Sequence, residues 1–323
     1  MKAIALISGG LDSLLAAKLI AQEGVEVIGL KFKIPFYLNT GKTLTDLGME
    51  ISEVDIGQEF LQLVLKPRYG YGANINPCID CKILMFTKAK EFMEQLSAKF
   101  IITGEVLGQR PMSQHRQALE LIEKKSGLEG LLLRPLSAGL LPETIPEKQG
   151  WVKRENLLNF SGRGRRLQIK LAKTLGIKDY AQPAGGCLLT DPLFSKKVKD
   201  LIAHGQLNRD NIELLKIGRH FRISPQAKLA VGRDEKENQE LVSLAKEKDY
   251  LFFPQEDLAG PTSLGRGIFN EELLELCARI TCRYCDLNGA IFSDIAYRRI
   301  PEEKNKVIKV SSLQESQLIN MRI

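Results

Sequence analysis

The first residues that could do chemistry form a short glycine-rich segment near the N-terminus. This segment, SGGLDS at residues 8–13, follows Ala3–Ile7, an apolar run of strand length, and Leu14, Leu15 and Leu19 then take helical spacing. Glycines let main-chain N–H groups approach an anion, and the positive end of the following helix faces the same spot. The order strand, turn and helix therefore predicts a phosphate site. Its expected binding residues are Ser8, Gly9, Gly10, Asp12 and Ser13.

Two better-known glycine loops are absent from the sequence. Neither GxxxxGK[ST] nor GxGxxG occurs, so the segment indicates neither a Walker A site nor a dinucleotide-binding site. Asp12 is expected to help place the magnesium that accompanies the phosphates, with support of the helix start as the alternative.

Three cysteines provide a second kind of chemistry. Cys78 and Cys81 form a CxxC at the start of a predicted helix, whose N-terminal amides would lower the pKa of both thiols. Cys187 follows Gly185 and Gly186 in a loop that we expect to be exposed. Three cysteines cannot complete a four-cysteine zinc site. They can hold a 4Fe-4S cluster and leave one iron open for an exogenous ligand.

A third motif, TGEVLGQRPMSQ, occupies residues 103–114 and follows a predicted strand. Together with SGGLDS and the LRPL of residues 133–136, it resembles the catalytic domain of ThiI-type and MnmA-type tRNA thiouridine synthases. SGGLDS itself resembles the pyrophosphate loop (PP-loop) of ATP pyrophosphatases. The resemblance covers about residues 1–180, and the motif departs from the ThiI pattern at Val106 and at residues 110–112.

This resemblance implies an activity and its cofactors. The expected enzyme is an ATP-dependent tRNA sulfurtransferase that adenylates a uridine carbonyl oxygen and replaces it with sulfur, using ATP, Mg²⁺ and a sulfur donor. Residues 104–114 would contact the nucleotide and the target uridine, with Gly104, Gln109 and Gln114 as binding candidates. The catalytic candidates are Asp12, Cys78, Cys81 and Cys187. Sulfur could reside on a cluster held by the three cysteines, which we prefer, or on a cysteine persulfide.

The strand pattern predicts the fold. Apolar or alternating runs at 25–32, 50–56, 100–103 and 131–133 add four strands to the first, and the segments between them have helical character, including a short helix over 40–47. Such alternation predicts a doubly wound parallel α/β sheet, here of the adenine nucleotide alpha hydrolase-like, PP-loop kind.

The second half of the chain suggests RNA binding. Residues 161–173 form a basic, mostly helical segment that could neutralise phosphates or be a solvated helix face. From about Gly218 the chain resembles NFACT-R domains in its Gly-Arg start, Asn238 and Leu241. We expect a small α+β RNA-binding domain there, with a dimerisation or packing domain as the alternative. The predicted domains are 1–180, a connecting segment 181–220 that carries Cys187, and 221–323.

Composition narrows the remaining choices. The chain has 323 residues, 44% hydrophobic and 26% charged, with a net charge of +7, which fits a nucleic-acid partner. It shows neither an apolar run long enough to span a membrane nor a signal peptide, so we expect a cytoplasmic protein without membrane partners. Cys277, Cys282 and Cys285 have metal-ligand spacing but lack an obvious fourth ligand, and we leave them out of the site.

Two alternatives from other classes stay open. The chain could be an RNA-binding protein with a degenerate PP-loop, or a PP-loop enzyme that thiolates or amidates a small molecule. A homodimer is possible, and the sequence does not determine the oligomeric state.

Overall fold

The computed structural model describes residues 1–37, 48–178, 180, 186–255 and 258–323, which fall into two compact units. The first unit is Met1–Asp191 and the second is Pro192–Ile323. Within the described residues, every helix is too short or too polar to cross a membrane.

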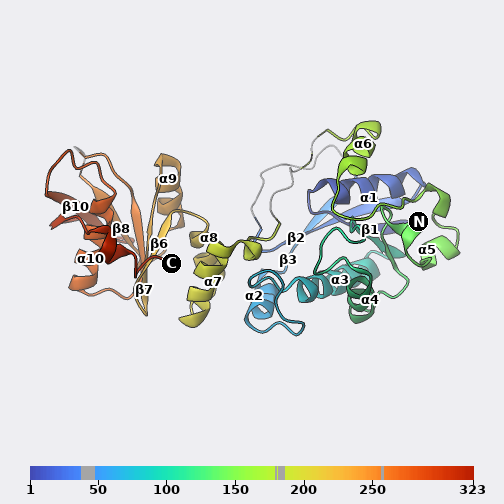
Figure 1. Ribbon diagram of the computed structural model, residues 1–323, viewed down its shortest axis with the longest axis horizontal. Helices are drawn as coiled ribbons and strands as arrows, with labels where there is room; N and C mark the ends of the chain where they lie inside the picture. The colour runs from blue at the N-terminus through green and yellow to red at the C-terminus, as the bar shows by residue number, and fades with distance from the viewer. Residues whose placement is uncertain (38–47, 179, 181–185, 256–257) are drawn as a thin grey trace. The chain divides into compact units, whose positions relative to one another are not determined.

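A five-stranded parallel sheet forms the centre of the first unit, in the order β3-β2-β1-β4-β5 (Figure 1). Its strands are β1 (Lys2–Leu6), β2 (Glu26–Lys33), β3 (Ile51–Asp55), β4 (Phe100–Ile102) and β5 (Leu132–Leu133). All five lie where the apolar runs predicted strands. The predicted doubly wound parallel sheet is confirmed.

Helices cover both faces of this sheet. In Figure 1, α1 and α6 lie on one side of the strands, and α2, α3 and α4 lie on the other. The α-helices are α1 (Leu11–Gln22), α2 (Gly57–Leu65), α3 (Cys78–Gln95), α4 (Arg116–Lys125), α5 (Ile145–Lys148) and α6 (Arg166–Thr174). Short 3-10 helices occupy Ala138–Leu140, Arg154–Asn156 and Leu188–Thr190. The predicted helix over 40–47 lies outside the described residues.

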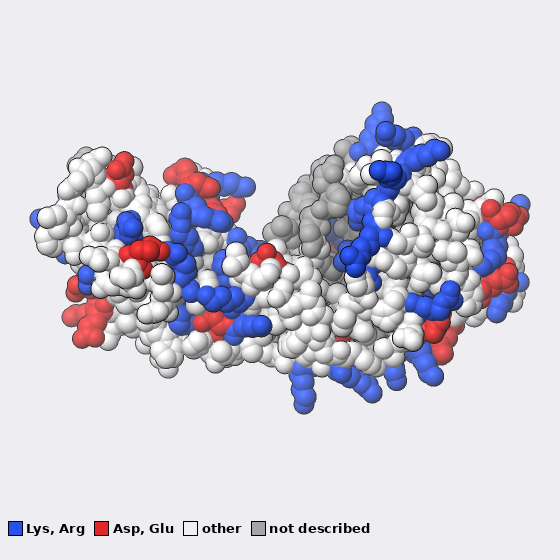
Figure 2. Space-filling view, in the orientation of Figure 1, with Lys and Arg blue, Asp and Glu red and all other residues white. Residues whose placement is uncertain are grey.

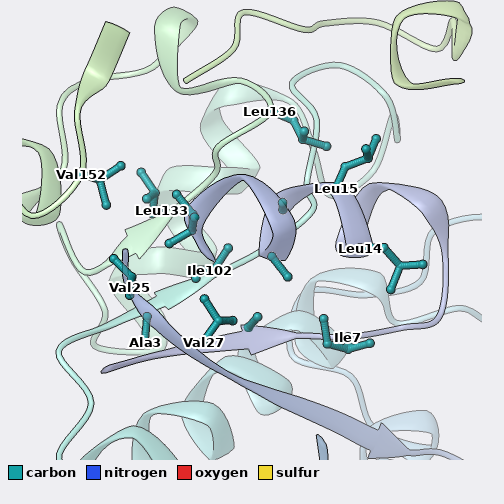
Figure 3. Packing of buried hydrophobic residues seen from close by; sticks show 14 of the residues in the cluster. Ala3, Ile7, Leu14, Leu15, Val25, Val27, Ile102, Leu133, Leu136 and Val152 are labelled. Carbon is teal, nitrogen blue, oxygen red and sulfur yellow. The ribbon is translucent and has the colours of Figure 1, made fainter. Parts of the chain in front are cut away.

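In the core of this unit α1 packs onto β1 and β2, α6 packs against α1, and side chains of β4 belong to the same cluster (Figure 3). Ala3 and Ile7 of the first strand region, Leu14 and Leu15 of α1, and Ile102 of β4 are all at most 2% exposed. Burying branched and small side chains in this way supplies the main favourable term in folding. The close packing fixes where the end of β1 lies relative to the end of β4.

The chain order creates a switch point between β1 and β4. From β1 the chain runs outward through β2 and β3 on one side, and through β4 and β5 on the other. In open α/β sheets, ligands bind where the carboxyl ends of two such neighbouring strands diverge. The SGGLDS segment follows β1 and residues 103–114 follow β4, so both predicted binding motifs meet at this point.

The second unit is an α+β domain around a six-stranded antiparallel sheet, in the order β11-β10-β8-β9-β7-β6. Its strands are β6 (Arg219–Ser224), β7 (Ala227–Val231), β8 (Tyr250–Pro254), β9 (Ser263–Gly267), β10 (Phe292–Arg299) and β11 (Lys306–Ser311). Its helices are α7 (Pro192–Ala203), α8 (Arg209–Leu215), α9 (Glu235–Leu244), α10 (Glu271–Arg283) and α11 (Glu315–Leu318). The predicted α+β class is confirmed. The predicted boundaries near 180 and 220 stay a prediction.

One lysine of this sheet is buried. Lys228 on β7 is 2% exposed, and its Nζ has no hydrogen-bond partner within the described part of the chain. Burial, with the neighbouring Arg222 and Arg266, lowers the pKa of Lys228 from its ordinary 10.5 to about 7. The folded state therefore releases a proton that the unfolded state keeps between these two pH values.

We expect Lys228→Met to raise the stability of the second unit and to remove part of its pH dependence. In the wild type, the unfolding free energy should rise as the pH rises from about 7 to about 10.5, because only the unfolded chain holds the proton there. Below pH 7 the variant should be more stable by at most about 5 kcal/mol, from about 1.4 kcal/mol per pKa unit. Urea unfolding in low-salt buffer, followed by circular dichroism at several pH values, measures the difference.

Lys236→Met serves as the matched control, because the Lys236 side chain is 85% exposed. This variant should keep the pH slope of the wild type. Equal slopes in wild type and Lys228→Met would contradict the prediction.

Candidate active site

The SGGLDS segment forms a tight turn between β1 and α1, as predicted. Gly9 has φ +77°, a left-handed conformation that glycine adopts without the penalty of a Cβ. The Ser13 hydroxyl donates to the Gly10 carbonyl at 2.8 Å, and the Ser8 and Ser13 hydroxyl oxygens lie 3.3 Å apart. The N-cap residue of α1 is Gly10, and no side chain caps the helix there. The N-terminal amides of α1 are therefore available to an anion.

Asp12 lies in the first turn of α1 with its two carboxylate oxygens in different surroundings. Its Oδ2 accepts a hydrogen bond from Gln109 Nε2 at 3.0 Å and lies 3.5 Å from Arg165 Nη2. Its Oδ1 is buried and has no partner among the described residues. An unpartnered buried carboxylate oxygen beside a phosphate site is a suitable ligand for a hard cation such as Mg²⁺.

Gly104 allows the two binding segments to touch. A Cβ at Gly104 would lie 2.4 Å from the carbonyl carbon of Asp12 and 2.5 Å from the nitrogen of Ser13. Real Cβ atoms do not approach backbone so closely, and only glycine fits without displacing the loop. The segment after β4 is thus packed directly against the turn at residues 8–13.

The basic segment reaches the same place through a backbone connection. Gly162 donates its N–H to the Leu107 carbonyl at 2.8 Å, and Leu107 and Ser161 form a parallel bridge. This connection brings Arg165, the N-cap residue of α6, to Asp12. The sequence marked 161–173 only as a basic segment beside the site. The contact of Arg165 with Asp12 depends on the packing of Leu107, which no local pattern reveals.

A buried ion network supports the segment after β4. Glu105 is 2% exposed, and its carboxylate lies 3.1 Å from Arg134 Nε and 3.3 Å from Lys82 Nζ. Burial opposes ionisation, but Lys82 and Arg134 outweigh it and lower the pKa of Glu105. Because Lys82 follows Cys81 on α3, the network also ties the cysteine-bearing helix to the loop of the phosphate site.

The CxxC begins α3, as predicted, since Cys78 is its first residue. Asp80 between the two cysteines is buried and accepts hydrogen bonds from the backbone N–H groups of Arg68 and Tyr69, both at 3.0 Å. This carboxylate therefore holds the preceding loop against the helix. The Cys81 sulfur lies 3.7 Å from the sulfur of Met85, one turn further along.

Two hydrogen bonds from distant segments hold the turn that carries Cys187. Asn74 Nδ2 donates to the Thr190 carbonyl at 2.8 Å, and Leu188 donates its N–H to the Phe36 carbonyl at 3.0 Å. Cys78 and Cys187 both lie close enough to Cys81 to raise the pKa of its thiol, and Cys78 also raises that of Cys187. The structure thus brings the three predicted cysteines together.

Arg110 and Tyr37 join this cysteine group, and the sequence analysis assigned a role to neither. Arg110 opposes the rise in the pKa of each of the three thiols and of Tyr37, so its positive charge faces all four groups. An ideal Cβ on Gly186 would lie 3.7 Å from Arg110 Nη1, which places the arginine against the residue before Cys187. In the sequence, Arg110 stands out only as a departure from the ThiI pattern.

The expected low thiol pKa values are wrong, as is the expected exposure of Cys187. Cys81 and Cys187 are 7% and 8% exposed. Burial raises the pKa of Cys78 and Cys81, and raises that of Cys187 to about 12. The cost of placing a thiolate in a low-dielectric interior exceeds the gain from helix amides and from Arg110. At neutral pH these thiols are protonated unless a cation binds them.

The described residues hold no group of three or more His, Cys, Asp or Glu side chains already arranged to bind a metal ion. Cys81 and Cys187 are buried and Cys78 is partly buried. Cys277 and Cys282 lie elsewhere, with 0% exposure in the core of the second unit.

The remaining predicted binding residues divide into two groups. Gln109 contacts Asp12, as described, and lies in the site. Gln114 is 4% exposed, its Oε1 lacks a partner among the described residues, and its carbonyl accepts from the Gly108 N–H at 2.7 Å. The backbone of Gln114 thus closes the loop that carries Gln109, and its role toward a ligand stays a prediction.

The parallel sheet, the glycine turn and the uncapped helix at the switch point define a nucleotide-binding α/β domain of the PP-loop class. Comparisons with known proteins make this more specific. Residues 1–145 match the family model described as Thiamine biosynthesis protein (ThiI), and residues 218–321 match that of the NFACT protein RNA binding domain. Both resemblances inferred from the sequence are confirmed.

Individual relatives agree with the first match. The tRNA-specific 2-thiouridylase MnmA of Nitratiruptor is 32% identical over 115 residues, which are 32% of this chain and 34% of that protein. A probable tRNA sulfurtransferase of Thermococcus kodakarensis is 31% identical over 157 residues, or 45% of this chain and 39% of that protein. The chain thus spans well under half the length of these relatives.

One solved structure, a 4-thiouridine synthetase in complex with RNA and bound ATP, aligns with 54% of this chain and 50% of its own. Its TM-score is 0.35 and its sequence identity is 23%.

Gly104→Ala tests the contact between the two binding segments. The added methyl group would displace the backbone of Asp12 and Ser13, so we expect ATP binding to weaken by at least about tenfold, or ~1.4 kcal/mol. The unfolding temperature of the first unit should also fall. Titration with a non-hydrolysable ATP analogue and a thermal melt measure the two effects.

Gly164→Ala is the matched control, because a Cβ at Gly164 would have no neighbour within 4 Å. Wild-type binding is expected for this variant. If Gly104→Ala also bound and melted like the wild type, the tight packing of the two segments would be refuted.

Proposed function

We propose that this chain is an ATP-dependent tRNA thiouridine synthase, a sulfurtransferase that activates a uridine carbonyl oxygen with ATP and replaces it with sulfur. One observation carries the proposal. Two consecutive residues connect the two kinds of chemistry, because Gln109 binds Asp12 of the phosphate loop and Arg110 faces the three thiols. A sulfur source one residue from a nucleotide site suits a reaction that needs both.

The chemistry explains why both parts are needed. A carbonyl oxygen is a poor leaving group, and transfer of AMP to it makes a good one. The turn at residues 8–13 would hold the departing pyrophosphate on its glycine backbone and the N-terminal amides of α1. Asp12, with its unpartnered Oδ1, would place Mg²⁺ and so reduce the negative charge of the phosphates.

The number of cysteines supports an iron-sulfur cluster over a persulfide relay. A relay needs only two cysteines, and the third would then be surplus. A 4Fe-4S cluster held by three cysteines supplies one iron with an open site for a sulfur ligand. Cys78, Cys81 and Cys187 would hold it, and Arg110 would offset its negative charge.

Two surfaces could hold the RNA. Basic side chains gather over α6 in Figure 2, and Arg163, Arg166, Lys170 and Lys173 are exposed on this segment. The second unit matches a model for an RNA-binding domain. Contacts of this kind neutralise phosphates and position a backbone without reading its sequence. We propose tRNA as the partner for both surfaces.

A tRNA thiolation assay tests the function. With ATP, Mg²⁺, a sulfide source and unmodified tRNA, we expect ATP-dependent formation of thiouridine, detected by mass spectrometry of the digested RNA. Asp12→Asn should lower the rate by about a hundredfold or more, since a positioned charge contributes ~3 kcal/mol or more to such sites. Pyrophosphate release that tRNA does not stimulate would favour a small-molecule substrate. Absence of both activities would favour the RNA-binding alternative.

Anaerobic reconstitution with iron and sulfide tests the cluster. We expect a broad absorption band near about 400 nm and about four irons per chain. The triple variant Cys78→Ala, Cys81→Ala, Cys187→Ala should lose both signals. Cys285→Ala is the control and should keep them, because Cys285 belongs to the second unit. A colourless wild-type protein would rule out the cluster and leave a persulfide route.

A further inference from the structure

Three basic side chains stand opposite one another in the sheet of the second unit. Lys228 on β7 is the register partner of Arg222 on β6 and of Arg266 on β9. Like charges at directly opposite positions of a sheet repel one another. This row, which we call the cation ladder, therefore requires negative charge beside it.

Two carboxylates neutralise the outer members of the cation ladder. Arg222 Nε lies 3.1 Å from Asp200 Oδ2 of α7, and Arg266 Nη2 lies 2.7 Å from Asp249 Oδ2 before β8. Both aspartates also bind a second guanidinium nitrogen of the same arginine. Lys228 has no ion pair within the part of the chain that the structure describes. Three positive and two negative charges leave one positive charge.

The surroundings of Lys228 provide no other compensation. The face of β7 that carries Lys228 also carries Ala230, which packs with Leu214 of α8 and Leu241 of α9. His220, two residues before Arg222, is buried, and its Nδ1 has no partner among the described residues. Burial and the charges of Lys197 and Lys228 lower the pKa of His220, so the imidazole adds no negative charge. Leaving a buried ammonium without a partner is costly.

We propose that the cation ladder is a binding site for one small monovalent anion of the size of chloride, with Lys228 Nζ as its principal donor. One negative charge completes the charge balance. The guanidinium groups already donate to Asp200, Gln206, Asp249 and the Leu244 carbonyl, whereas the ammonium has its donors free. A lysine ammonium offers three donors and no acceptor, which suits one small anion.

Solvent reaches the strand beside Lys228. A cavity of about 260 Å³ is lined by the ion pair of Arg266 and Asp249 and by Asn208, Asp210, Asn211, Lys246 and Glu247. Arg266, which lines this cavity, is the direct neighbour of Lys228 across the sheet.

The site predicts a pH dependence of anion binding. Below about pH 7 the ammonium of Lys228 is charged and ready to bind. At higher pH the anion must draw a proton onto Lys228, so its apparent affinity falls. Chloride should therefore bind more weakly at pH 9 than at pH 6.5.

The experiment is calorimetric unfolding of the full chain at constant ionic strength, with sodium chloride replacing sodium gluconate stepwise. We expect one transition of the wild type to rise by a few degrees and to saturate, with a smaller rise at pH 9 than at pH 6.5. Lys236→Met, an exposed-lysine control, should respond like the wild type, and Lys228→Met should not respond. Broadening of the ³⁵Cl NMR line by the wild type, reduced in Lys228→Met, gives a direct readout of binding.

Three outcomes would overturn the proposal. The first is no chloride response in the wild type. The second is an equal response in Lys228→Met, which would mean that chloride acts elsewhere. The third is a response to phosphate, but not to chloride, that Lys228→Met abolishes, because this would make the site one for oxyanions.

Discussion

The contact of Gly104 with the backbone of Asp12 and Ser13 is the constraint on which the first unit depends. It sets the carboxyl end of β4 against the turn that follows β1, at the switch point of the parallel sheet. This contact fixes the position of residues 104–110 relative to that turn. The buried ion pairs of Glu105 with Arg134 and Lys82 hold the segment in this position, since breaking a buried ion network leaves an uncompensated charge.

From this fixed segment each neighbouring residue reaches a different part of the site. Leu107 binds the backbone of Gly162 and so delivers the basic segment, Gln109 binds Asp12, and Arg110 reaches the turn of Cys187. A displacement of the segment would therefore change the phosphate site, the basic surface and the cysteine group together. This shared dependence gives a physical reason for the coupling of nucleotide chemistry to sulfur chemistry that we propose.

Local patterns predicted what local physics determines. The apolar runs and the turn at 8–13 predicted the sheet, the start of α1 and the place of the phosphate site, because strand length, glycine and helix spacing act over a few residues. The burial of Cys187 and the contact of Arg165 with Asp12 could not be found this way, since both depend on segments far apart in the chain. Lys228 shows the same limit. The polar side chain in the alternating pattern of β7 suggests a face exposed to solvent, but in the structure Lys228 is buried.

Buried polar atoms without partners appear in both units. One belongs to a negatively charged group and the other to a positively charged group. Asp12 Oδ1 is a carboxylate oxygen beside a predicted phosphate site, and Lys228 Nζ is an ammonium nitrogen between two guanidinium groups. Folded proteins satisfy nearly all buried polar groups, and each exception costs about 1–3 kcal/mol. The carboxylate oxygen can be satisfied by a cation and the ammonium by an anion. The same physical rule thus leads from the first unit to magnesium and from the second to a small anion.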